Sequence, residues 1–194
     1  MSITTYYTAA SLDGFIADEQ HSLEWLFRQD QDESGPLNYT QFFARVGAVV
    51  MGSTTYEWIL RHENGRWPYR LPAWVMSTRD LPKVDGDVRF ARGDVRSVHA
   101  EMTAAAGEKD LWVVGGGDLA GQFVDAGLLD EIIVYVASVT LGAGAPLLPR
   151  KLDLRLEELA RNKAFACARY SVVGPTTRAG ERPQRVLGFP HDRQ

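Results

Sequence analysis

The stretch of residues 111–127 constrains the fold more than any other part of the chain. It begins with four apolar residues, too few for a helix and rich in valine, as in a buried parallel strand. Three glycines follow at once: Gly115, Gly116 and Gly117. A helical pattern comes next, with its apolar residues on one face, and Gly127 is well placed to end that helix. The stretch therefore predicts a strand, a glycine turn and a helix.

This arrangement is suited to binding an anion. The first N–H groups of a helix have no partner within it, and the helix dipole favours negative charge there. Glycine has no Cβ, so a phosphate group can come close to the backbone. A tight turn without any ligand is the alternative interpretation, and the stretch alone leaves both open.

The same glycines formally match the dinucleotide fingerprint of the Rossmann fold, as Gly115-x-Gly117-x-x-Ala120. That fingerprint requires an acidic residue after the next strand to hold the ribose. The next expected strand is 132–137, and residues 138–142 contain no acid. The motif also lies past the middle of the chain, so we reject a Rossmann fold and keep a phosphate-binding turn.

Composition limits the class of protein. A chain of 194 residues fits one domain with a real core, and its net charge of −4 argues against a nucleic-acid partner. No apolar run has the length of a membrane span and no signal peptide is visible, so we expect no membrane partner and a cytoplasmic location. A single cysteine, Cys167, excludes an internal disulfide and a multi-cysteine zinc site, and it is expected to fill core space. The four histidines show no metal-ligand spacing, so we expect no metal site and place them on the surface: His21, His62, His99 and His191.

The remaining patterns alternate between strands and helices, which predicts an α/β sheet with helices on both faces. Strands are expected at residues 2–10, 47–51, 73–77, 88–91, 111–114, 132–137, 152–159 and 164–173, the last two forming an antiparallel edge pair. Helices are expected at residues 37–46, after 52, at 95–106 and after 117. Residues 140–148 are too rich in glycine for a helix and are expected to form a loop, and residues 175–194 a loosely ordered tail. Residues 1–174 then form a single domain.

Two further strands end in groups that suit a phosphate. One runs into Gly52, Ser53, Thr54 and Thr55, whose hydroxyls can cap a helix or donate to phosphate oxygens; capping alone requires only one of them. The other ends in residues 77–79, Ser-Thr-Arg, where guanidinium suits a phosphate monoester, although a solvated arginine in a turn is the alternative. Ligands bind beyond the carboxyl ends of the strands in such sheets. Three such ends together suggest a dinucleotide that carries an extra phosphate.

Residues 11–17, Ser-Leu-Asp-Gly-Phe-Ile-Ala, combine a turn signal with an apolar pair. A loop of this kind often closes over a site, although a plain hairpin turn also explains it. Asp13 is the candidate catalytic residue, as a group that orients substrate or relays a proton; its alternative role is to stabilise the turn at Gly14. Asp32 and Glu33 are further candidate carboxylates, and Tyr56 could line a pocket or belong to the core.

These segments resemble a known family. Residues 49–57 and 112–117 are similar to the two cofactor segments of the dihydrofolate reductase fold. Residues 11–17 and 141–148 resemble more specifically the reductase domain of riboflavin biosynthesis, which is the C-terminal half of a bifunctional deaminase–reductase. The resemblance covers roughly residues 3–174, with four motifs in family order. It implies a three-layer, dihydrofolate reductase-like α/β fold whose central sheet is mostly parallel and has an antiparallel C-terminal edge.

The resemblance also implies NADPH as cofactor. The positions that match cofactor contacts, or that lie beside the nicotinamide, are Ala9, Ala10, Gly14, Gly52, Ser53, Thr54, Thr55, Ser77, Thr78, Arg79, Val114, Gly115, Gly116, Gly117, Asp118 and Leu119. Two features depart from the wider family. The helix expected at 37–46 lacks the carboxylate that a folate reductase uses for its pterin, and one cysteine is too few for the zinc deaminase half.

The sequence thus predicts a stand-alone, NADPH-dependent reductase of a small polar heterocycle or a ribosylamino-pyrimidine-like compound, similar to 5-amino-6-(5-phosphoribosylamino)uracil reductase. Two other functions remain open at this point: a non-catalytic NADPH-binding module and a true dihydrofolate reductase. The resemblance further implies a homodimer.

Overall fold

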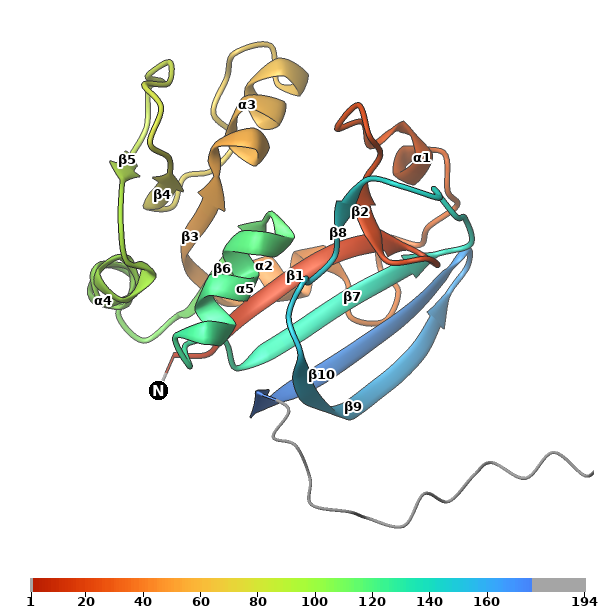
Figure 1. Cartoon of the computed structure of the whole chain (residues 1–194). Coiled ribbons are helices and arrows are strands. Elements are labelled where there is room, and N and C mark those ends of the chain that lie inside the picture. The colour runs from red at the N-terminus through yellow and green to blue at the C-terminus, as the bar shows by residue number, and fades with distance from the viewer. Residues whose placement is uncertain (1, 176–194) are drawn as a thin grey trace, which may run out of the picture.

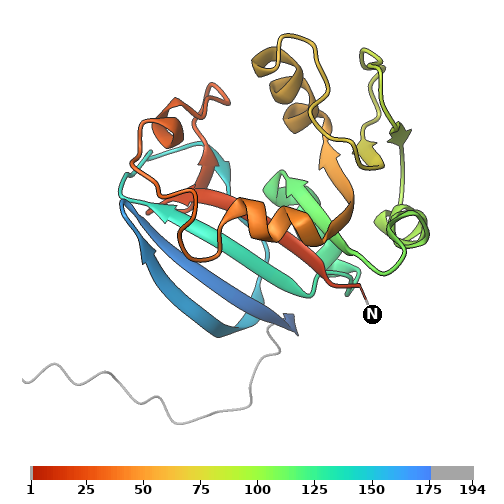
Figure 2. The same ribbon diagram turned by 180° about the vertical axis from the view of Figure 1, so that it is seen from behind.

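The computed structural model describes residues 2–175, which form one large sheet with helices on both faces (Figures 1 and 2). The strand order across this sheet is β5-β4-β3-β6-β1-β7-β10-β9. Its strands are β1 (Thr4–Ser11), β3 (Val46–Gly52), β4 (Ala73–Met76), β5 (Val88–Ala91), β6 (Asp110–Gly115), β7 (Glu131–Ala137), β9 (Leu152–Asn162) and β10 (Phe165–Pro175). A separate two-stranded sheet consists of β2 (Phe15–Ala17) and β8 (Ala145–Pro146).

The six strands from β5 to β7 pair in parallel, whereas β10 runs antiparallel to β7 and to β9. This confirms the predicted fold class, a mostly parallel sheet with an antiparallel C-terminal end. β3 is buried along residues 46–51, as expected for a strand covered on both faces. The carboxyl ends of β3, β4 and β6 lie at the same edge of the sheet, because neighbouring parallel strands point the same way.

The helices form two outer layers. The core on one face packs against α4 (Val95–Ala106) and α5 (Gly117–Asp125). The core on the other face packs against α1 (Glu24–Phe27), α2 (Tyr39–Arg45) and α3 (Ser53–His62). The apolar periodicity explains these contacts, since Val98 and Met102 of α4 and Leu119 and Phe123 of α5 are all buried. Gly127, with φ of 69°, follows the end of α5 as predicted.

The structure corrects two details of the sequence interpretation. Residues 140–148 are not entirely a loop, because β8 pairs with β2 through two residues that the glycine-rich composition concealed. His99 is not a surface residue: it is half-buried, and its ring lies 3.0 Å from the Thr4 hydroxyl. Pro175 still belongs to β10, and the remainder of the expected tail, 176–194, lies outside the described residues together with His191.

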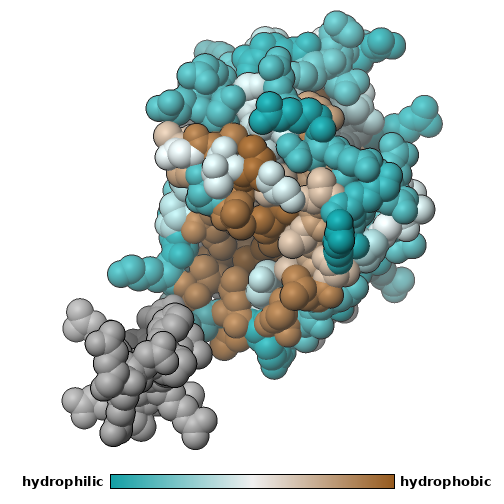
Figure 3. All heavy atoms as spheres, turned by 90° about the vertical axis from the view of Figure 1, so that its right-hand side faces the viewer, coloured by the Kyte–Doolittle hydropathy of each residue, from teal (hydrophilic) through white to brown (hydrophobic). Residues whose placement is uncertain are grey.

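One face of the antiparallel strands is open and apolar (Figure 3). Three leucines of β9 lie on this face opposite Ala168, Tyr170 and Val172 of β10. Their exposed fractions are 39%, 50% and 66% for Leu154, Leu156 and Leu159. The three leucines and their neighbours form one contiguous apolar patch, which differs from the isolated exposed leucines found on most protein surfaces. Within residues 2–175, no helix is both long and apolar enough to cross a membrane.

Candidate functional site

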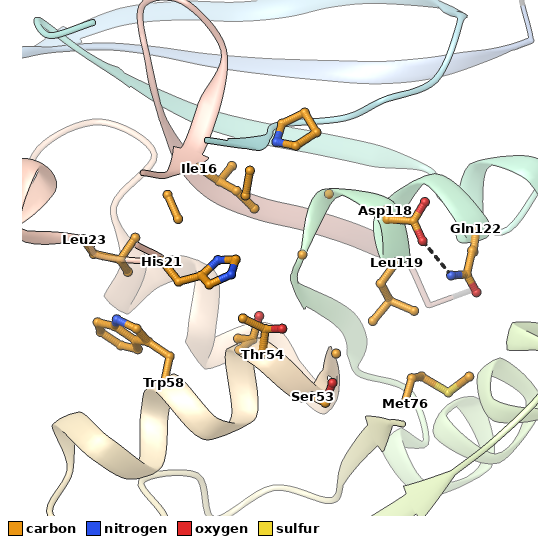
Figure 4. Close-up of a pocket in the computed structure, with 17 residues that line it drawn as sticks. Ile16, His21, Leu23, Ser53, Thr54, Trp58, Met76, Asp118, Leu119 and Gln122 are labelled. Carbon is orange, nitrogen blue, oxygen red and sulfur yellow. Dashed lines mark hydrogen bonds between the residues drawn. The ribbon is translucent and has the colours of Figure 1, made fainter. Parts of the chain in front are cut away.

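A cleft of about 420 Å³ opens where β3 and β6 end, between the first turns of α3 and α5 and the small β2–β8 sheet (Figure 4). Its lining includes eight of the residues predicted to bind cofactor: Gly52, Ser53, Thr54, Thr55, Gly116, Gly117, Asp118 and Leu119. The two turns that the sequence identified separately therefore meet in one site. Among the described residues, no group of three or more acidic, histidine or cysteine side chains is placed to hold a metal.

The two longer helices that begin at the cleft, α3 and α5, have no side-chain caps. Gly52 is the N-cap of α3 and Gly116 that of α5, and neither supplies an acceptor for the free N–H groups of the first turn. The helices away from the cleft differ. The side chains of Asn38 and Asp94 accept from backbone N–H groups at the starts of α2 and α4. Two sets of unsatisfied donors and two positive dipole ends thus face the same space, which suits an anion.

Neither the backbone conformation nor the packing requires glycine at these two N-caps, and the missing side chains leave open space beside the helix N-termini. Both have φ values open to any residue, −81° at Gly52 and −83° at Gly116. A Cβ at Gly52 would come no closer than 3.9 Å to other atoms, and one at Gly116 would lie 3.8 Å from Ile16 Cδ1. Gly117 is different, because a Cβ there would overlap the carbonyl oxygens of Pro146 and Leu147. Gly52 and Gly116 are therefore the positions where a phosphate could approach the backbone.

The Gly115–Gly116 peptide bond is cis, and Gly115 has φ of 149°, a conformation that only glycine adopts readily. Gly115 is buried next to the Thr55 side chain, and Val114 before it is half-buried against the core. Neither residue is part of the cleft lining. They support the turn from behind, and any cofactor contact they make stays a prediction.

Asp118 brings a negative charge to the edge of the anion site, and its neighbours offset that charge. Its carboxylate accepts a hydrogen bond from Gln122 at 3.0 Å and pairs with Arg150 at 3.1 Å. The hydrogen bond from Gln122, followed by the contact with Arg150, lowers the pKa of Asp118. Arg150 also pairs with Asp125 at 2.7 Å, so it connects both ends of α5. The acid is thus neutralised locally and leaves the dipole end of the helix usable.

The predicted monoester contacts, Ser77, Thr78 and Arg79, lie just beyond the cleft, which Met76 borders. Arg79 forms two hydrogen bonds with the Glu57 carboxylate, at 2.8 and 3.2 Å. The Ser77 hydroxyl is bonded to the backbone of Arg79. A bound phosphate would have to share or displace Glu57, so the part of these residues in binding stays a prediction.

The loop of residues 11–17 is tied to the segment that contains β8. The Asp13 carboxylate accepts hydrogen bonds from the Ser11 hydroxyl at 2.6 Å and from the backbone N–H groups of Leu141 and Gly142, and the first of these contributes most to lowering its pKa. Gly14 accepts from the N–H of Leu147 at 2.8 Å. These bonds give Asp13 a structural role. It does not line the cleft, and a catalytic role for it stays a prediction.

The remaining candidates lie away from the cleft. Ala10 of β1 is buried in the core and Ala9 is half-buried beside it, and neither is part of the lining. Asp32 is exposed and bonded to Ser34 in its own turn, and Glu33 is exposed on the same loop. Tyr56 belongs to the core, where its hydroxyl donates to the Pro82 carbonyl oxygen at 2.6 Å.

Sequence reasoning missed several residues of the lining. Ile16 and Ala17 come from the expected loop, but the sequence analysis proposed no site role for His21, Leu23, Trp58, Met76, Gln122, Ala145 and Pro146. The helical period offered one usable signal: Trp58 follows Thr54 by four residues, so both lie on the same side of α3. The other residues are brought to the cleft by tertiary contacts between distant segments.

The fold and this cleft define an α/β protein with a candidate nucleotide site at the carboxyl ends of its parallel strands. Residues 3–169 match the model of the RibD C-terminal domain, and the chain belongs to that family. It is 32% identical over 158 residues to the uncharacterized protein YwjB of Bacillus subtilis, covering 79% of this chain and 88% of YwjB.

Solved structures agree with this assignment. The putative riboflavin biosynthesis protein from Shewanella sp. PV-4 superposes with a TM-score of 0.75 and 25% identity, covering 88% of this chain and 98% of that one. The diaminohydroxyphosphoribosylaminopyrimidine deaminase/5-amino-6-(5-phosphoribosylamino)uracil reductase from Thermotoga maritima gives 0.58 with 17% identity, covering 88% of this chain and 56% of that one. The second comparison supports the dihydrofolate reductase-like fold alone.

Proposed function

We propose that this protein is an NADPH-dependent reductase of a small polar heterocycle or a ribosylamino-pyrimidine-like compound. The observation that carries the proposal is the pair of uncapped helix N-termini, at Gly52 and Gly116, that face one cleft. Each offers free backbone donors and open space for a phosphate, as a pyrophosphate requires. When bound, NADPH would supply a hydride; the protein would hold it, orient the acceptor and exclude water.

The lining suggests which way the dinucleotide lies. Met76 borders one end of the cleft and leads directly into residues 77–79, the predicted contacts of the extra phosphate. That phosphate belongs to the adenosine half, so we assign the Met76 end to adenosine. The nicotinamide would then lie beyond Thr54, toward Ile16 and His21 (Figure 4).

The substrate class rests on the family and on the lining of the second end. The name of the Thermotoga maritima protein includes the activity 5-amino-6-(5-phosphoribosylamino)uracil reductase. In this chain the second end combines apolar walls from Ile16 and Leu23 with an indole ring and an imidazole. Pockets for small polar heterocycles commonly join apolar walls with a few polar groups in this way.

Two measurements test the proposal. Isothermal calorimetry should show NADPH binding, and absorbance of the dihydronicotinamide should fall when 5-amino-6-(5-phosphoribosylamino)uracil is added. No binding would refute the cofactor assignment. Binding without turnover, on this acceptor and on a panel of related heterocycles, would instead support the alternative of a non-catalytic NADPH-binding module. The engagement of Asp13 in structural hydrogen bonds favours that alternative, because it leaves Asp118 as the one carboxylate among the cleft-lining residues described.

We further propose that the protein forms a homodimer through the open apolar face of β9 and β10. This face exposes Leu154, Leu156 and Leu159. Two copies of the chain could bury the same apolar face against each other around a two-fold axis, and no like charges of this patch would then meet. Light scattering of the wild type should give twice the chain mass, and Leu159→Glu should give the monomer mass. A monomeric wild type would refute this assembly without affecting the cofactor assignment.

A further inference from the structure

We propose that His21 faces the bound nicotinamide and acceptor and donates the proton that accompanies reduction. This inference rests on the proposed reductase function and assigns a catalytic residue to it. The position was not predicted from the sequence, which placed His21 among the surface histidines. The structure puts it in the lining of the cleft, with its ring pointing into the cavity between Ile16 and Thr54 (Figure 4).

A tight turn holds His21 in this position. The Asp18 carboxylate accepts from the backbone N–H groups of Gln20 at 3.0 Å and Ser22 at 2.7 Å, and the N–H of His21 donates to the Asp18 carbonyl oxygen at 3.0 Å. His21 has φ of 57°, in the left-handed region that residues with a Cβ seldom occupy. Within residues 2–175 its imidazole has no hydrogen bond or ion pair, so it is available to a ligand.

Few other groups in the cleft can exchange a proton. Among the lining residues described, the ionisable side chains are His21 and Asp118. Asp118 is paired with Arg150 and lies at the first turn of α5, beside the assigned phosphate position. The charged or titratable groups on the elements around His21 are Asp18 and Glu19 in its own turn, Glu24 of α1, Tyr56, Glu57, Arg61 and His62 of α3, and Asp118 and Asp125 of α5. Of this set, His21 and Asp118 line the cleft and both are exposed. The Asp118 carboxylate is already bonded to Gln122 and Arg150, whereas the His21 imidazole has no such partner among residues 2–175.

The chemistry balances with NADPH as reductant. The carbon of a polar double bond in the acceptor takes the hydride, and the pair of electrons that leaves the double bond forms a new bond from its heteroatom to a proton of the His21 imidazolium. NADPH becomes NADP⁺, the acceptor gains two hydrogens, and neutral His21 recovers a proton from water. Histidine suits this role because its side chain changes charge between about pH 5 and 8.

A chemical test needs no acceptor. Diethyl pyrocarbonate carbethoxylates exposed imidazoles, and mass spectrometry identifies which histidine has reacted. We expect NADPH at about ten times its Kd to slow the modification of His21 about tenfold, because about a tenth of the protein stays free. His62 is exposed outside the lining and serves as internal control, with an unchanged rate. Equal modification of His21 with and without bound NADPH would overturn its assigned position.

A kinetic test addresses proton donation. With 5-amino-6-(5-phosphoribosylamino)uracil as acceptor, His21→Gln should lower kcat about 100-fold, the lower range for a general acid, and should remove the fall in kcat with rising pH that a general acid produces. Gln20→Ala, in the same turn, should keep both the rate and the pH profile. A His21→Gln enzyme with the wild-type pH profile would overturn the inference while leaving the reductase intact.

The outcomes separate the two proposals. If the wild type does not bind NADPH, the proposed function fails and the inference falls with it. If NADPH binds and His21 stays fully reactive, the inference alone fails. If His21 is protected but the variant changes only the KM of the acceptor, then His21 contacts substrate without donating the proton, and the catalytic assignment is wrong.

Discussion

The two ends of the cleft are built in different ways. The phosphate end consists of backbone N–H groups and short hydroxyl side chains at the starts of two regular helices, α3 and α5. The other end consists of large side chains, among them His21, Leu23 and Trp58. They come from a turn, from the residue before α1 and from the second turn of α3. The first end suits any phosphate, whereas the second can discriminate between acceptors. Under the proposed function, the first end would hold the phosphates of the cofactor and the second the nicotinamide and the acceptor, so phosphate binding and substrate choice could change independently.

The largest effect is expected at the phosphate end. Gly116→Asp should weaken NADPH binding at least about 100-fold, because a carboxylate would occupy the space beside the free N–H groups and repel the phosphates. The fold should survive, since a Cβ at Gly116 meets nothing closer than 3.8 Å. Gly116→Ala is the matched control and should lose much less affinity. Calorimetry on variants with wild-type melting temperatures makes the measurement, and unchanged affinity in Gly116→Asp would remove this turn from the site.

The next effect probes the other end. Trp58→Leu should raise the KM of the acceptor about thirtyfold, because stacking of a base-like ring on an aromatic side chain contributes about 1–3 kcal/mol. Trp58→Phe retains a ring and should lose only part of this. The Kd of NADPH should change little in either variant if the two ends are independent. An equal loss for cofactor and acceptor would show that the ends act as one site.

The third prediction concerns cofactor choice at the adenosine end. Arg79→Ala should weaken NADPH about tenfold and barely change NADH, because a charge-assisted hydrogen bond to the extra phosphate contributes roughly 1.5–3 kcal/mol and Arg79 is exposed. Added salt should reduce the difference. Glu57→Gln, which weakens the competing ion pair, should raise NADPH affinity a few fold. Parallel titrations with both cofactors decide: an equal loss for NADPH and NADH would assign Arg79 to the fold or to the pyrophosphate.

The same contrast explains how much the sequence could predict. The phosphate end follows from local order, in which a buried strand, a glycine and a helix are adjacent in the chain; the turns at Gly52 and Gly116 were both identified, and the structure brings them together. The strands and the antiparallel C-terminal pair were also accessible, because each strand carries its own pattern of apolar residues. The order of the strands in the sheet was not predicted, since it depends on contacts between distant segments.

The other end could not be predicted because its geometry is not local. His21 reaches the cleft through a turn held by the Asp18 carboxylate, and no periodicity marks such a turn. β8 is a strand of two residues that depends on pairing with β2. Asp13 was selected as catalytic because its turn looked functional, while its partners at Leu141 and Gly142 lie 128 and 129 positions away along the chain.

The smallest effect is expected from Asp13, which lies outside both ends of the cleft. Asp13→Ala should leave kcat and the Kd of NADPH within a few fold of wild type and should lower the melting temperature. The substitution removes the carboxylate that accepts hydrogen bonds from Ser11, Leu141 and Gly142. The pKa of Asp13 is lowered in the folded protein, so its stabilisation is complete above the pKa of the unfolded chain and is lost as pH falls through the lower folded value. The difference in melting temperature between variant and wild type should therefore shrink in acid.

Asp32→Ala is the control, since Asp32 also has a lowered pKa but, among the described residues, its carboxylate accepts hydrogen bonds within its own turn, from Ser34. A large loss of kcat in Asp13→Ala with an unchanged melting temperature would return Asp13 to the catalytic role that the sequence first suggested, and would place the proton donor in the loop of residues 11–17 instead of at His21.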